Sequence, residues 1–122
     1  MNADIQNAAL RLSLEWGENF MAPIQARLRE TFPELTTDQA DELEKSSRQI
    51  QSFAFALYEE LYFERMTRPD VEAQIKAKFP FLNDENMTRL YNQWMYYAWH
   101  GWRRDDGGIF GLFYERLQRS FR

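Results

Sequence analysis

Residues 14–43 read LEWGENFMAPIQARLRETFPELTTDQADEL, and residues 61–90 read LYFERMTRPDVEAQIKAKFPFLNDENMTRL. The two stretches align without a gap when the chain is shifted by 47 positions. The identical pairs include Leu14 with Leu61, Leu43 with Leu90, and the Phe-Pro steps at 32–33 and 79–80. A fixed internal period indicates that one supersecondary unit occurs twice and that each copy buries its apolar face against the other. The repeat therefore informs architecture rather than chemistry.

Outside the proline and glycine positions, apolar residues recur at the three- and four-residue steps of α-helices. Pro23 fits the first turn of a helix, and each Phe-Pro step should end one. We predict an all-α protein, a single-domain bundle of five or six helices over residues 1–122, with 14–43 matching 61–90 as an internal pseudo-repeat. The expected helices cover residues 3–20, 23–31, 37–66, 69–78, 84–104 and 108–121.

Local signals refine this prediction. Thr36 and Gln39 have the spacing of a capping box, and Asn83 is a good N-cap for the helix that follows it. The Phe and Leu residues of the two Phe-Pro-x-Leu turns are expected to insert into the core. The helix predicted over 37–66 is polar in its first half and apolar in its second. We expect the first half to project toward solvent or a partner.

Composition limits the possible chemistry. Hydrophobic residues make up 44% and aromatic residues 16% of the 122 residues, which is too apolar for a disordered chain. The absence of cysteine excludes disulfides, thiolate zinc sites and cysteine nucleophiles. His100 is the single histidine, and with no second His or Cys we favour a structural or surface role for it over a metal ligand or general base. Because phosphate-binding loops and nucleophile motifs are also missing, we predict no cofactor, no metal and no enzyme activity.

Charge is distributed unevenly along an acidic chain of net charge −4. Residues 34–72 hold ten acidic and four basic residues, whereas residues 86–122 hold six arginines and three acidic residues. This asymmetry could steer a charged partner or orient self-association, although solvated helix faces are the commoner explanation. The acidic balance disfavours nucleic-acid binding. Charged residues near the N-terminus and the absence of a long apolar window predict a cytoplasmic protein without a transmembrane segment.

The densest aromatic segment is WMYYAWHGWRR at residues 94–104. Helical spacing puts Trp94, Tyr97 and Trp102 broadly on one side and Tyr96, Trp99 and Arg103 on another. Such a helix is either surrounded by neighbours, which is the more common arrangement, or leaves one surface for a partner. We hypothesise a small non-enzymatic protein–protein interaction protein, such as an adaptor, chaperone-like or inhibitory partner. Its hypothetical partner-binding residues are Trp99, Trp102, Arg103, Arg104, Phe113 and Arg116.

Three alternatives stay open. Residues 36–53 resemble a degenerate helix-turn-helix, in which Ser47, Arg48 and Gln49 would face DNA bases, although Glu44 and Lys45 occupy the turn. The basic amphipathic segment 108–121 could form a homodimer contact or lie on an anionic membrane surface, although a closing helix of the bundle is more common. An enzyme or ligand carrier with His100 in an aromatic pocket is the third alternative.

Overall fold

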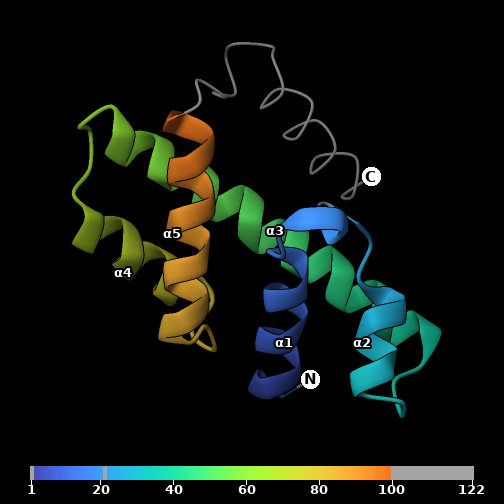
Figure 1. Cartoon of the computed structure of the whole chain (residues 1–122). Coiled ribbons are helices and arrows are strands. Elements are labelled where there is room, and N and C mark those ends of the chain that lie inside the picture. Colours follow the sequence, from blue (N-terminus) through green and yellow to red (C-terminus); the bar gives the residue numbers. More distant parts are fainter. Residues whose placement is uncertain (1, 21, 100–122) are drawn as a thin grey trace.

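The computed structural model describes residues 2–20 and 22–99 (Figure 1). These residues form five α-helices and one 3₁₀ turn, and they contain no strand. The all-α class predicted from the sequence is therefore confirmed, whereas the helix expected over 108–121 lies outside the described residues. The elements are α1 (Ala3–Ser13), η1 (Gly17–Asn19), α2 (Gln25–Thr31), α3 (Thr37–Tyr62), α4 (Arg68–Lys78) and α5 (Asp84–Trp99).

Helix α3 is the element against which α1, α2, α4 and α5 all pack. Figure 1 shows it crossing the molecule, with α1 and α2 beside its N-terminal half and α4 and α5 beside its C-terminal half. Two clusters of buried apolar residues follow this division. The smaller cluster comprises Ala9, Leu12, Ile24, Leu28, Leu35 and Leu43. The larger one comprises Leu10, Leu14, Ile50, Ala54, Phe55, Tyr58, Val71, Ile75, Leu82, Met87, Leu90, Trp94, Tyr97 and Ala98.

The two Phe-Pro turns have the same local geometry. Phe32 ends α2 at φ −126° and ψ 76°, and Phe79 ends α4 at φ −127° and ψ 73°. In each turn the leucine three residues later, Leu35 or Leu82, donates its backbone N–H to the phenylalanine carbonyl at 3.1 Å. Both leucines are buried, as expected, whereas both phenylalanines are only half-buried. The leucine is thus the residue that anchors each turn in the core.

Side-chain caps begin α3, α4 and α5, and those at Thr36 and Asn83 are the ones expected from the sequence. Thr36 and Gln39 form the complete capping box at the start of α3. The Asn83 side chain accepts the backbone N–H of Asn86 at 2.8 Å and so caps α5. The Thr67 side chain caps α4 in the same way, with Pro69 in the first turn. These bonds satisfy N–H groups that have no partner within the helix itself.

Two expectations about helix extent and exposure are wrong. Helix α1 ends at Ser13 rather than near residue 20, because Leu14 leaves helical geometry and Gly17 adopts φ 79°. The first half of α3 does not project freely, since Ala40 and Leu43 are buried. The 37–66 pattern is charged overall, but a narrow apolar stripe is sufficient to pack against α1 and α2.

The structure also contradicts the helix-turn-helix that the sequence left open as an alternative over 36–53. Helix α3 continues without interruption through this segment, so no turn separates two helices. Ser47 and Arg48 are buried and cannot face bases. Arg48 pairs with Glu44 at 2.8 Å and donates to the Ala22 carbonyl at 3.3 Å. The arginine that suggested nucleic-acid recognition instead ties α3 to the segment preceding α2.

Asn7 joins α1 to the turn between α4 and α5. Its Nδ2 donates to the Phe81 carbonyl at 2.8 Å, and its Oδ1 accepts the Asn83 backbone N–H at 3.1 Å. Asn86 Nδ2 donates to the Asn7 carbonyl at 2.9 Å and to Asn7 Oδ1 at 3.0 Å. Asn86 is buried. One side chain therefore satisfies backbone and amide groups of a segment more than 70 positions away.

We predict that Asn7→Ala lowers the free energy of unfolding by about 2–4 kcal/mol, because it leaves several buried donors and acceptors without partners. Urea denaturation followed by circular dichroism measures the change. Asn92→Ala is the control, since Asn92 is an exposed asparagine of α5. A loss for Asn7→Ala no greater than that of the control would show that the network adds no stability.

Tyr58 is a fully buried tyrosine of α3, with ring-centroid distances of 5.5 Å to Tyr91 and 6.4 Å to Trp94. Its hydroxyl has no hydrogen-bond partner in the described structure. Burial raises its pKa well above the ordinary tyrosine value; the negative charge of Glu72 adds to this effect and Arg68 opposes it. The neutral phenol is therefore the form that folding favours.

We predict that Tyr58→Phe leaves the unfolding free energy at neutral pH unchanged or raises it by about 1 kcal/mol, because an unbonded buried hydroxyl is removed. Because folding raises the pKa of Tyr58, the contribution of its neutral phenol to the free energy of unfolding is fully present below the ordinary pKa of about 10. This contribution falls as the pH rises above that value. The variant should thus lose less stability than wild type between about pH 9 and pH 11. Urea titrations across this range test the prediction, and equal slopes would contradict it.

Candidate functional site: an aromatic platform beside a basic groove

Helix α5 divides its aromatic residues between the core and the surface. Trp94 and Tyr97 are buried, whereas Tyr96 is 41% exposed. These three residues occupy the two sides expected from helical spacing. Of the hypothesised partner-binding residues, Trp99 is the last residue of α5, and its side chain lies outside the described part. Trp102, Arg103, Arg104, Phe113 and Arg116, together with His100, also lie outside the described residues.

The exposed part of α5 meets an aromatic residue from a distant part of the chain. Trp16 is 51% exposed, and its ring packs edge-on against Tyr96 at 5.0 Å between centroids. Phe20 stacks against Trp16 at 5.6 Å, and buried Tyr97 contacts both at 6.3 and 6.0 Å. We refer to Trp16, Phe20, Tyr96 and Tyr97 as the aromatic platform. Tyr97, its inner member, belongs to the core. Its outer members, above all Trp16 and Tyr96, present large apolar surface at the edge of the molecule.

Local backbone geometry explains why Trp16 reaches the surface. In sequence it continues the apolar stripe of α1, which would bury it if the helix ran on. The helix ends at Ser13, and Gly17 takes a positive φ that glycine adopts without steric cost. The turn η1 then follows and brings Phe20 back over Trp16. The premature end of α1 thus converts a core position into an exposed one.

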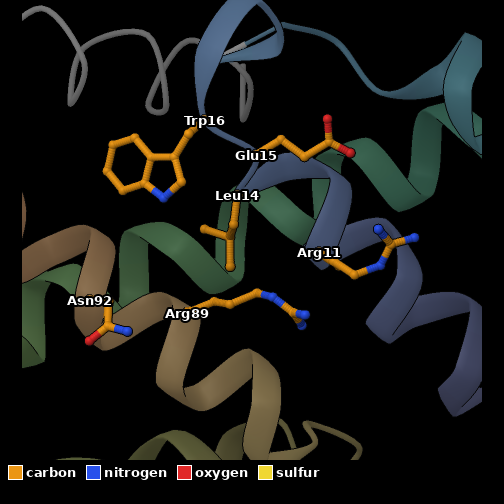
Figure 2. Close-up of a pocket in the computed structure, with 6 residues that line it drawn as sticks. All are labelled: Arg11, Leu14, Glu15, Trp16, Arg89 and Asn92. Carbon is orange, nitrogen blue, oxygen red and sulfur yellow. The ribbon is translucent and has the colours of Figure 1, made fainter.

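A groove between α1 and α5 begins beside Trp16. Its main hollow has a volume of about 440 Å³. Figure 2 shows the residues that line this hollow: Arg11, Leu14, Glu15, Trp16, Arg89 and Asn92. A second hollow of about 210 Å³ shares Arg11 and Arg89 and continues toward Asp4, Asn7, Asn83 and Glu85. Arginines from two different helices therefore line the whole groove. This is a basic feature on a protein whose net charge is −4.

The single carboxylate of the main hollow is engaged elsewhere. Glu15 pairs with Arg27 at 2.9 Å and accepts a hydrogen bond from Asn19 at 3.0 Å. In Figure 2 the Glu15 carboxylate and the Trp16 indole extend to opposite sides of the chain. Glu15 therefore contributes little neutralising charge to the two arginines.

The described residues contain no group of three or more His, Asp or Glu side chains that could hold a metal ion. None of the helices in residues 2–20 and 22–99 is long and apolar enough to cross a membrane. Comparisons with protein-family models, curated proteins and solved structures gave no match. What this region can do must therefore be argued from its own geometry.

Sequence reasoning did not single out Arg11, Trp16 or Arg89. Trp16 falls inside the helix predicted over 3–20, although the glycine that follows it is a signal that the helix ends early. Arg11 and Arg89 are single charged residues within predicted helices, and no sequence motif marks them. Only the packing of α1 beside α5 places them along one groove, so no local sequence signal could have paired them.

We predict that Gly17→Ala lowers the free energy of unfolding by about 1 kcal/mol, because an alanine at φ 79° is strained. An added Cβ would meet no atom within 4 Å, so the loss reflects backbone strain rather than a clash. Glu64→Gly is the reciprocal control, since Glu64 already adopts φ 59° and glycine there should raise stability. Urea denaturation of both variants tests the pair. A stable Gly17→Ala protein would show that the turn below Trp16 can rearrange.

Proposed function

We propose that this protein is a non-enzymatic protein–protein interaction protein, acting as an adaptor, chaperone-like or inhibitory partner. The observation that carries the proposal is the half-exposed Trp16, whose ring packs against buried Tyr97 and partly exposed Tyr96. Tryptophan and tyrosine dominate the energetic centres of protein interfaces because they bury large areas with few rotatable bonds. A rigidly backed pair of this kind is suited to anchor a partner.

The sequence extends this surface beyond α5. Position 99 lies three residues after Tyr96, and residues three apart share a face of a helix. The proposed contact region therefore continues from the platform into Trp99, Trp102, Arg103 and Arg104, and then to Phe113 and Arg116 of the last predicted helix. Aromatic anchors would supply the buried area, and the arginines would orient the partner.

We also propose that residues 14–43 and 61–90 are two copies of one helical unit. The matched dihedral angles at Phe32 and Phe79 and the matched burial of Leu35 and Leu82 support this. Stacked units bury their inner faces and leave their outer faces available. Trp16 and Phe20 of the platform belong to the first unit, whereas Tyr96 and Tyr97 lie on α5, which begins in the second unit and continues past it.

We predict that Trp16→Ala and Tyr96→Ala each reduce capture of a host protein at least tenfold, as expected when an interface anchor worth about 2 kcal/mol is truncated. The tagged chain is expressed in its own host, and copurified polypeptides are quantified by native mass spectrometry. The helical circular-dichroism signal should stay near wild type, because both side chains are substantially exposed.

Phe63→Ala is the matched control. Phe63 is another exposed aromatic residue at the end of a helix, and it lies outside the platform. It should leave capture unchanged. Equal losses for all three variants would indicate nonspecific stickiness, and a bare wild-type monomer or homodimer would contradict the proposed function.

A further inference from the structure

We propose that the groove beside Trp16 binds an acidic segment of a partner protein, with a carboxylate side chain between Arg11 and Arg89 and an apolar side chain against Leu14 and Trp16. This inference rests on the proposed function and names the chemistry of the partner. It concerns the groove between α1 and α5, whereas the proposed function depends on the aromatic platform next to it.

The first step is the charge of the groove. The Arg11 side chain forms no ion pair or hydrogen bond with any described residue. Among the described residues, the one ion pair of Arg89 is a 4.0 Å pair with Glu85. The Glu85 side chain is 80% exposed, and such surface pairs contribute little. Two cations that line one hollow repel each other, and an anion between them relieves that repulsion. Glu15 cannot act as this anion, because its carboxylate is bound by Arg27 and Asn19.

The second step is preorganisation. Arg89 Nη1 donates to Asn86 Oδ1 at 3.0 Å. Asn86 is itself buried and held by Asn7 through two hydrogen bonds. The buried polar network therefore orients the Arg89 guanidinium, while its other N–H groups stay available to a ligand. A positioned guanidinium loses less side-chain entropy on binding a carboxylate than a mobile one does.

The third step is the shape of the site. A small-molecule site encloses most of its ligand, but this hollow is lined by the exposed side chains of Arg11, Trp16 and Asn92. An open groove with cations along it and an indole at one end fits side chains of an extended or helical segment. The carboxylate belongs in the main hollow, because Asp4 and Glu85 line the second one. A polyphosphate chain would meet those same acidic residues and the overall negative charge.

The probes are three nonapeptides with acetylated and amidated ends, which repeat Gly-Leu-Glu, Gly-Leu-Gln or Gly-Leu-Lys three times. Binding to the full chain is followed by NMR, using the arginine Nε–H and tryptophan indole N–H signals. We expect the Glu peptide to shift the Arg11, Arg89 and Trp16 signals and to bind about fivefold or more tightly than the Gln peptide, because its hydrogen bonds are charge-assisted. The Lys peptide should not bind, and added salt should weaken the binding of the Glu peptide.

Arg11→Gln and Arg89→Gln should each lower the affinity for the Glu peptide about five- to tenfold and leave the affinity for the Gln peptide unchanged. Arg29→Gln is the matched control, since Arg29 is an exposed arginine on α2, away from the groove. Equal affinity of the Glu and Gln peptides, or unchanged affinity in the Arg11 and Arg89 variants, would overturn the inference. So would self-association of the protein that Arg11→Gln abolishes, because the occupant would then be a second copy.

The two proposals can fail separately. If no peptide binds while Trp16 still governs capture of a host protein, the acidic-segment inference is wrong and the proposed function stands. If the Glu peptide binds through Arg11 and Arg89 while host capture is independent of Trp16, the groove is an acidic-segment site and the platform is not the partner surface.

Discussion

The packing of four helices against one long helix is the constraint on which the rest of the described structure depends. Helix α3 has 26 residues, so its two halves can serve two apolar clusters at once. Its N-terminal half packs with α1 and α2, and its C-terminal half packs with α4 and α5. Because Leu10 of α1 and its C-cap residue Leu14 also belong to the larger cluster, α1 links the two halves. The groove between α1 and α5 exists because both helices are held side by side on the same support.

Polar groups inside this packing help to fix the placement of the helices. The Asn7 side chain donates to the Ala3 carbonyl of its own helix, and its other partners lie in the α4–α5 turn and the first turn of α5. Only the correct placement of α1 provides those other partners. Elsewhere, Gln51 Nε2, Gln93 Oε1 and Trp94 Nε1 are buried without partners among the described residues. Each such group opposes folding by its lost hydration. The burial of aromatic and aliphatic residues offsets these losses, and the satisfied asparagine network selects the register of α1 against α5.

The same network connects stability to the candidate site. Asn86 accepts from Arg89 and donates to Asn7, so the guanidinium in the groove is positioned by a residue that the fold requires. On the other side of the groove, Tyr97 belongs to the core and also supports Trp16 and Phe20. Surface groups that are backed by buried ones keep a defined geometry, and this lowers the entropy lost when a partner binds.

The sequence by itself determined the secondary structure and most of its boundaries. Three kinds of signal act locally: capping residues such as Thr36 and Asn83, the Phe-Pro steps, and the helical spacing of Trp94 and Tyr97. Their effects can therefore be predicted without knowledge of the tertiary structure. The burial of Arg48 and the placement of Arg11 and Arg89 along one groove were decided only by tertiary structure. Burial depends on which apolar stripe finds a partner, and a groove depends on the distance between helices far apart in sequence. Neither quantity is encoded in the spacing of residues along one helix.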